Sequence, residues 1–178
     1  MNSNKIALKL YAKSSPLPET IRFVEVFHDW IKKGVLAELM IDVIEYGHVE
    51  RGPIVLFVGH ESDYSIDMSE GRAGLSYLRK RVNSDIPGDS LALTDSFARV
   101  LDVADKLATD PRLDGFQVGR DEVLLRLIDR LNAPNSDATF DASRSEIELV
   151  ASAALGKSAK LTREAEDLRE PFAVRIRT

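Results

Sequence analysis

The longest stretch of this sequence without a charged side chain covers only residues 52–60. A helix that crosses a membrane needs about 20 consecutive apolar residues, so no segment of this sequence fits that role. Within the stretch, residues 54–58 form a continuous apolar run with glycines close by on both sides. A run this short is typical of a strand rather than a helix. We therefore expect a central strand here, buried on both of its faces.

Two kinds of apolar pattern divide the rest of the sequence. A period of two, as in Ile6, Leu8 and Leu10, is typical of a half-buried strand, whereas spacings of three and four are typical of a helix. The helical pattern covers about residues 18–33, 89–107 and 137–155. Strands are expected over about residues 5–13, 38–49, 54–58, 64–68, 73–81, 159–164 and 172–177. Two of these, 64–68 and 73–81, are joined by residues 69–72 and predict a hairpin.

Residues 116–132 fit both patterns. Val123, Leu127 and Leu131 are spaced for one face of a helix and also for one face of a strand. We favour a strand, because glycines stand at the start of the segment and a proline follows its end.

With that strand, the elements follow in the order β-α-β-β-β-β-α-β-α-β-β. No linker rich in proline, glycine or serine divides the chain. We therefore predict a single α+β domain over residues 1–178, built on a mainly antiparallel sheet with about three helices.

Residues with capping preferences stand at the expected ends of the helices. Gly34 and Gly156 follow the first and third helices, where glycine readily takes the left-handed backbone conformation. Asp89 or Ser90 precedes the second helix and Asp137 precedes the third. Short side-chain oxygens at such positions accept hydrogen bonds from the first helical turn.

Charge and cysteine content exclude several classes of function. The net charge is −5, and an acidic chain of mixed sign has no basic stripe to neutralise a phosphate backbone, so we expect no nucleic-acid partner. The absence of cysteine excludes disulfide scaffolds, cysteine-ligated metal sites and thiol catalysis. The first residues lack the apolar core of a signal peptide, so a cytoplasmic location and no membrane partner are expected.

The densest polar cluster, residues 59–72, follows directly on the apolar run. Its candidate catalytic residues are His60, Glu61, Asp63 and Asp67. An imidazole beside carboxylates can hold a divalent cation or act in general acid–base chemistry. The spacing matches neither a calcium loop nor a zinc-protease helix, and a solvated connection between strands explains the charges equally well. We therefore predict no metal ion and no cofactor.

A turn centred near residues 51–52 would place His60 opposite Val43 and near Asp42. A carboxylate at that position would orient the imidazole ring for catalysis, or form an ordinary structural hydrogen bond with it. Of the other histidines, His28 is expected at the edge of the core and His48 beside a turn, exposed to solvent.

Other polar side chains are candidates for binding. Arg72 could hold an anionic group. Residues 129–135 could also contact a ligand, although an Asx-type turn into the third helix explains their composition. The candidate binding residues are His60, Tyr64, Arg72, Tyr77, Arg79, Asp129, Arg130 and Asn135.

Several motifs occur together along the chain. They are Val58-Gly59-His60-Glu61 with Tyr64 and Asp67, Gly71-Arg72, Gly74-Leu75-x-Tyr77-x-Arg79-Lys80, Phe27-His28-x-Trp30-Ile31, Ile41-Asp42-Val43 and Asp129-Arg130-Leu131-x-Ala133-Pro134-Asn135. As a set they resemble a family of small bacterial α+β proteins of about this length and of unassigned function. The resemblance implies one intact domain and carries no catalytic role. Asn132 stands where the family has an apolar residue, which predicts an exposed position.

Two functions are consistent with these observations. We expect a non-enzymatic binding, assembly or regulatory protein that associates with itself or with another protein. The sequence has no phosphate loop, nucleophile elbow or dinucleotide fingerprint, and its apolar first helix and residues 54–58 need cover. The alternative is an enzyme that binds a small molecule or a metal through the cluster from His60 to Arg72.

Overall fold

The computed structural model describes residues 5–13, 16–47, 51–80, 89–164 and 167–178. The strands are β1 (Ile6–Ala12), β2 (Met40–Glu45), β3 (Pro53–Gly59), β4 (Ser62–Asp67), β5 (Gly74–Arg79), β6 (Val118–Leu127), β7 (Lys160–Arg163) and β8 (Phe172–Arg177). The helices are α1 (Thr20–Lys33), α2 (Asp89–Thr109) and α3 (Asp137–Leu155), with short 3₁₀ turns η1 (Ser69–Gly71) and η2 (Pro111–Leu113). The predicted order of elements is confirmed.

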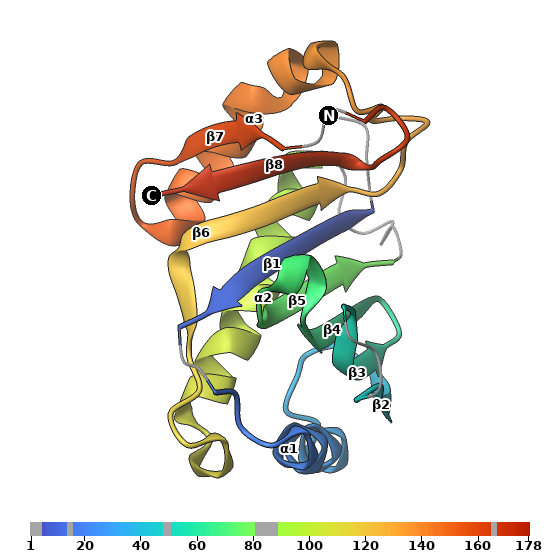
Figure 1. The fold of residues 1–178 in the computed structure, drawn as a ribbon, viewed down its shortest axis with the longest axis vertical. Coiled ribbons are helices and arrows are strands. Elements are labelled where there is room, and N and C mark those ends of the chain that lie inside the picture. The colour runs from blue at the N-terminus through green and yellow to red at the C-terminus, as the bar shows by residue number, and fades with distance from the viewer. Residues whose placement is uncertain (1–4, 14–15, 48–50, 81–88, 165–166) are drawn as a thin grey trace.

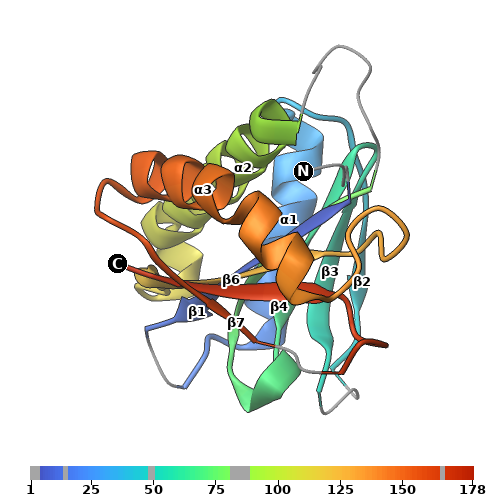
Figure 2. The ribbon, with the colours of Figure 1, turned by 90° about the horizontal axis from the view of Figure 1, so that it is seen from above.

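All the strands form one antiparallel sheet in the order β2-β3-β4-β5-β1-β6-β8-β7 (Figure 1). The three helices lie on one side of this sheet, as Figure 2 shows. None of the three described α-helices lies on the other side, which we call the open face. The predicted α+β class with a mainly antiparallel sheet is therefore confirmed.

Two local predictions are also confirmed: the hairpin, and a strand in the segment that fitted both patterns. β4 and β5 form the expected hairpin, with Ser62 opposite Arg79 and Asp67 opposite Gly74. The segment that fitted both patterns forms β6, which lies between β1 and β8. Its alternate residues Val123, Leu125 and Leu127 are fully buried toward the helices, which accounts for the period of two.

The core fills the space between the helices and the sheet. Ile6, Leu8 and Leu10 of β1 face it and are buried. In α1 the ring of Phe27 stacks on that of Phe57 from β3, with 4.5 Å between ring centroids. Aromatic contacts of this kind add to the free energy gained by removing the rings from water.

The prediction that residues 54–58 form a central strand buried on both faces is wrong. β3 is second from one edge of the sheet, and only one of its faces meets the helices. Val55 and Phe57 are fully buried there, whereas Leu56 and Val58 lie half-buried on the open face. The apolar run therefore contributes to two surfaces: the core on the helix side and an apolar surface on the open face.

The helix ends follow the predictions with one correction. Gly34 and Gly156 end α1 and α3 with φ of 59° and 70°, the left-handed conformation that favours glycine. The cap of α3 is Ser136 and not Asp137, because the Ser136 hydroxyl accepts the hydrogen bond from the backbone N–H of Thr139. The second helix begins at Asp89, and the predicted caps Asp89 and Ser90 have side chains outside the described set.

Histidine positions differ in part from expectation. His28, predicted at the edge of the core, is exposed on the outer side of α1. The prediction for His48 falls outside the described residues.

Neighbouring residues of β3 provide a direct test of the one-sided core. We expect Phe57→Ala to lower the free energy of unfolding by about 3–5 kcal/mol, because it removes a fully buried ring. Leu56→Ala should cost only about 1 kcal/mol, since Leu56 is half-buried on the open face. Urea denaturation measures both variants, and equal losses would show that the two faces of β3 are equally buried.

Candidate binding site on the open face

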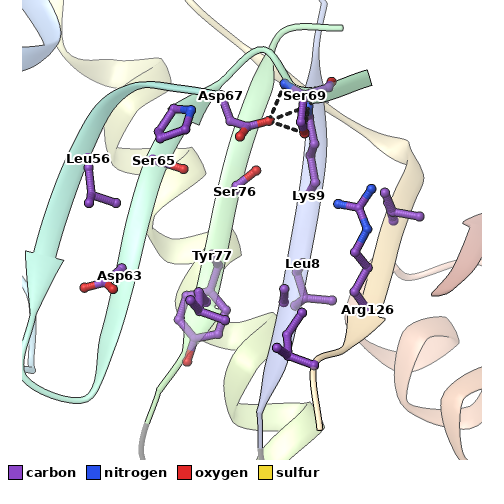
Figure 3. A pocket seen from close by; sticks show the side chains of 15 residues that line it. Leu8, Lys9, Leu56, Asp63, Ser65, Asp67, Ser69, Ser76, Tyr77 and Arg126 are labelled. Carbon is purple, nitrogen blue, oxygen red and sulfur yellow. Dashed lines mark hydrogen bonds and ion pairs between the residues drawn. The ribbon is translucent and has the colours of Figure 1, made fainter. Parts of the chain in front are cut away.

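The open face carries a hollow of about 360 Å³, which we call the open-face hollow. It extends over β3, β4, β5, β1 and β6 (Figure 3). Apolar side chains form most of its lining, and two serines lie near its middle. Its lining includes Leu56, Ser65, Ser76, Leu78, Leu124 and Ile128.

The alternation of side chains along each strand selects which residues reach this hollow. Of the residues in β4, Asp63, Ser65 and Asp67 face the open side, whereas Tyr64 and Ile66 belong to the core. This division follows from the period of two in a strand.

Lys9 of β1 is an unusual residue for a sheet face, because its side chain is only 3% exposed. Its ammonium group donates three hydrogen bonds: to the Asp67 carboxylate (2.6 Å), the Ser69 backbone oxygen (2.7 Å) and the Ser69 hydroxyl (2.9 Å). The Ser69 hydroxyl in turn donates to Asp67. Figure 3 shows the three side chains together at one end of the open-face hollow. All three donors of the ammonium are thus used, which is the condition under which a buried charge is tolerated.

Burial and pairing act in opposite directions on the two charges. Burial alone would raise the pKa of Asp67, but the hydrogen bonds from Lys9 and Ser69 together hold this pKa below its usual value. Burial also lowers the pKa of Lys9, and the hydrogen bond to Asp67 only partly offsets that effect. The carboxylate is therefore ionised at neutral pH and serves as the counter-charge of the ammonium.

A second ionic cluster lies beside the first, around Tyr11 and Arg175. Arg175 donates to Glu164 at 2.8 Å, to Glu122 at 2.6 Å and to the Tyr11 hydroxyl at 2.8 Å. The hydrogen bonds to Glu164 raise the pKa of Arg175 despite its burial. The Arg72 guanidinium also lies over the Tyr11 ring, 3.6 Å from its centroid. Burial raises the pKa of Tyr11 to about 12, so the phenol stays protonated.

Two further ion pairs border the open-face hollow. Lys80 donates to Asp63 at 2.6 Å, and Arg126 donates to Glu70 at 2.5 Å. Together with the pair of Lys9 and Asp67, they place neutralised charges around an apolar centre.

Ser65 and Ser76 lie opposite each other on neighbouring strands and face the middle of the hollow (Figure 3). Within the part of the chain that the structure describes, neither hydroxyl has a hydrogen-bond partner. These two hydroxyls are therefore the polar atoms that a bound group could reach without breaking an existing bond.

A separate polar cluster is buried on the helix side. The Glu38 side chain is 2% exposed and accepts hydrogen bonds from the Ser62 N–H (3.0 Å), the Ser62 hydroxyl and the Tyr64 hydroxyl (2.8 Å). Arg99 of α2 lies 3.4 Å from the same carboxylate. Burial raises the pKa of Tyr64, which stays a donor. This cluster ties the start of β2 to β4 and α2, and its depth gives it a structural role.

The three predicted catalytic carboxylates are each engaged in an ion pair. Asp63 and Asp67 lie on the open face, but each is held in an ion pair with a lysine. Glu61 pairs with Arg99 at 3.1 Å on the side of α2. His60 is exposed in the turn between β3 and β4.

The predicted register that set His60 opposite Val43 is wrong. Asp42 lies opposite Val58, and the backbone N–H of His60 donates to the Leu39 oxygen at 2.8 Å. The register differs because β2 carries a bulge between Met40 and Asp42 and because the turn is centred closer to the N-terminus than expected.

The predicted binding residues also separate. Tyr64 and Tyr77 pack against each other on the helix side, 5.3 Å between ring centroids, and Arg79 is buried there beside Asp95. Arg72 covers Tyr11 on the open face instead. These four side chains therefore divide between the two sides of the sheet.

Residues 129–135 have the structural role that the turn composition indicated. Asp129 accepts hydrogen bonds from the backbone of Leu131 and Asn132, and Asn132 is exposed as predicted. Arg130 donates to the Arg169 oxygen, and the buried Asn135 donates to the Asp167 oxygen. These contacts join the loop before α3 to the loop before β8.

Sequence reasoning missed Lys9, Ser69 and Arg126. Lys9 was visible as the polar member of an alternating strand, but alternation alone predicts a solvated lysine. Its counter-charge, Asp67, is 58 residues away in the sequence. Only the order of strands in the sheet reveals the pair.

No family model, curated protein or solved structure matches this chain. No group of three or more histidine, aspartate or glutamate side chains within the described ranges is arranged to hold a metal ion. Among the helices that the structure describes, none has both the length and the apolar character needed to cross a membrane.

Removing the counter-charge of Lys9 tests the buried pair. We expect Asp67→Asn to lower the free energy of unfolding by about 3 kcal/mol at pH 7, because the ammonium is left buried and unpaired. The folded pKa of Asp67 lies below its unfolded value of about 3.9, so the stabilisation is present above that pH and is lost as the pH falls further. The difference between wild type and variant should therefore shrink below about pH 4.

Urea denaturation at several pH values measures this effect. The double variant Lys9→Met, Asp67→Leu is the control, because it removes both charges and should recover most of the loss. A difference between wild type and Asp67→Asn that does not change in acid would contradict the assignment.

Proposed function

We propose that this protein is a non-enzymatic binding protein, and that the open-face hollow receives an apolar side chain of a protein partner. The observation that carries the proposal is an apolar hollow bordered by ion pairs on a sheet face that no helix covers.

The hollow has the distribution of groups found in protein interfaces. Leu56, Leu78 and Leu124 provide an apolar centre, and the ion pairs of Lys9, Lys80 and Arg126 lie around it. Interfaces commonly have an apolar centre and a polar rim. Since the rim charges are already paired, a partner can cover them without leaving an isolated charge.

The size and polarity of the hollow favour an aromatic anchor. A volume of about 360 Å³ accommodates one large side chain or a small molecule. Tyrosine and tryptophan combine an apolar ring with one hydrogen-bonding group, and they are frequent anchors at interfaces. In the hollow that group would meet the hydroxyls of Ser65 and Ser76, which face its middle.

The placement of ionisable groups supports binding over catalysis. Asp63 and Asp67 are each held in an ion pair with a lysine, and the ammonium of Lys9 has all its donors engaged. An enzyme that uses the cluster from His60 to Arg72 remains the alternative, and it would need these side chains to move together.

Three narrower statements are part of the proposal. The partner is a second copy of this chain or another protein, and not a nucleic acid, which agrees with the net charge of −5. The cytoplasmic location rests on the sequence alone and stays a prediction. Membership of the bacterial family rests on the motifs quoted above and also stays a prediction.

Filling the hollow tests the proposal. The probe is 8-anilinonaphthalene-1-sulfonate, which offers an aromatic body and one anionic group. We expect the native protein to bind it, and Ser76→Trp to weaken binding by about tenfold, because an indole would occupy the space. Leu149→Trp is the matched control, since Leu149 is exposed on α3, a helix on the other side of the sheet. Fluorescence titration measures all three proteins.

Native mass spectrometry of the protein isolated from its own host extends the test to the partner. A second protein retained by the wild type and by Leu149→Trp, but lost from Ser76→Trp, would support the proposal. Equal dye binding by both tryptophan variants would show that the open-face hollow is not the binding site. A monomer that retains a metal ion or a small substrate-like molecule would favour the enzyme alternative.

A further inference from the structure

We propose that copies of this chain join edge to edge, with β2 of one copy pairing antiparallel with β7 of the next. The inference extends the self-association contained in the proposed function. It does not depend on what the open-face hollow binds, because the hollow lies on the face of the sheet and these strands lie at its edges.

β2 and β7 are the two outer strands of the sheet in the described part of the chain (Figure 1). The backbone N–H of Tyr46 donates to Ile54 of β3, so the alternate residues Val43 and Glu45 turn their backbone groups away from β3. In β7, the backbone N–H of Glu164 donates to Ala173 of β8. The alternation of hydrogen-bonded pairs then directs the backbone N–H and C=O of Leu161 away from β8. Each edge therefore offers backbone groups to a further strand.

The topology makes the two edges compatible in direction. Every neighbouring pair of strands is antiparallel and the sheet has 8 strands, so β2 and β7 run in opposite directions. A second copy added beside β2 through its β7 would continue the antiparallel pattern. Val43 and Leu161 point their backbone groups outward from the sheet edges, and the side chains of both lie on the helix side of the sheet. Such pairing would thus keep the helices of both copies on the same side.

The charges of the two edges are opposite. Asp42 and Glu45 are exposed on β2, Lys160 is exposed at the start of β7, and Lys157 is exposed in the bend before it. None of the four forms an ion pair with another described residue. β2 carries no basic residue and no proline, the features that commonly protect an edge strand from pairing.

Pairing between like edges is disfavoured by the same charges. Two copies of β2 would bring four carboxylates together, and two copies of β7 would bring their lysines together. Only the pairing of β2 with β7 sets acids beside bases. The proposal therefore commits to a second copy of this chain as the occupant of the β2 edge.

One register satisfies both charge and apolar contacts. If Asp42 lies opposite Lys160 of the next copy, antiparallel counting sets Ile41 opposite Leu161, and it brings Glu45 to the side of Lys157, which precedes β7. Ile41 is 57% exposed in the single chain, at the bulge of β2, and Leu161 is partly buried. This contact would cover apolar surface that the isolated chain leaves in water.

Charge reversal tests the pairing. Light scattering after size exclusion should show, at low salt, a mass above the monomer that falls as salt screens the edges. The first variant is Asp42→Lys, Glu45→Lys, and the second is Lys157→Glu, Lys160→Glu. Each alone should associate about tenfold more weakly or worse, because its two edges then carry like charges. An equal mixture of the two variants should restore association, since each then offers the other an opposite edge.

The outcomes separate this inference from its alternatives. A wild-type monomer at all concentrations would overturn it, as would a mixture that stays monomeric while each variant keeps the circular dichroism of the wild type. Association unchanged in the Lys157→Glu, Lys160→Glu variant would show that β7 is not involved. Because the chain has no cysteine, Asp42→Cys with Lys160→Cys gives a second readout: oxidation should link different copies. Dye binding by the open-face hollow is measured separately, so its failure would leave this result unaffected.

Discussion

The architecture depends on one constraint: three helices cover only one side of an eight-stranded antiparallel sheet. Every second residue of each strand faces the side without helices, and that side must satisfy its own polar groups. Long charged side chains do this by pairing across strands, as Lys9, Arg126 and Arg175 show. The open face is therefore held together by ion pairs, whereas the other face is held by apolar packing.

The pair of Lys9 and Asp67 has a local role beyond neutralising charge. It joins β1 to the end of β4, and the additional bonds to Ser69 fix the 3₁₀ turn that follows. That turn carries Glu70, whose carboxylate reaches Arg126, Arg175 and Tyr11. One buried ammonium thus positions a loop on which both ionic clusters depend, and it shapes one end of the open-face hollow. An apolar residue at position 9 could not direct the turn in this way.

Periodicity in the sequence was sufficient for the order of elements and for the hairpin of β4 and β5, because both depend on neighbours in the chain. It was not sufficient where distant strands decide the environment. Residues 54–58 have the composition of a strand buried on both sides, but β3 has no helix over its second face. The pairing of β2 with β3 is centred closer to the N-terminus than expected and carries a bulge, so His60 does not lie opposite Val43, and no sequence signal marks that bulge. The candidate site was missed for the same reason, since its residues come from strands whose order is not written in the sequence.

The position of β1 has a consequence for how the chain folds. β1 precedes the other strands of the sheet in the chain but lies in its interior, where Leu8 pairs with Tyr77 of β5 on one side and with Leu125 of β6 on the other. A nascent chain that has reached only α2 still exposes one edge of β1, and the core cannot close until β6 leaves the ribosome. Such non-local pairing slows folding and leaves an apolar strand edge exposed during synthesis. Lys9 places a charge on β1 during the interval in which β1 is an edge strand, before β6 pairs with it.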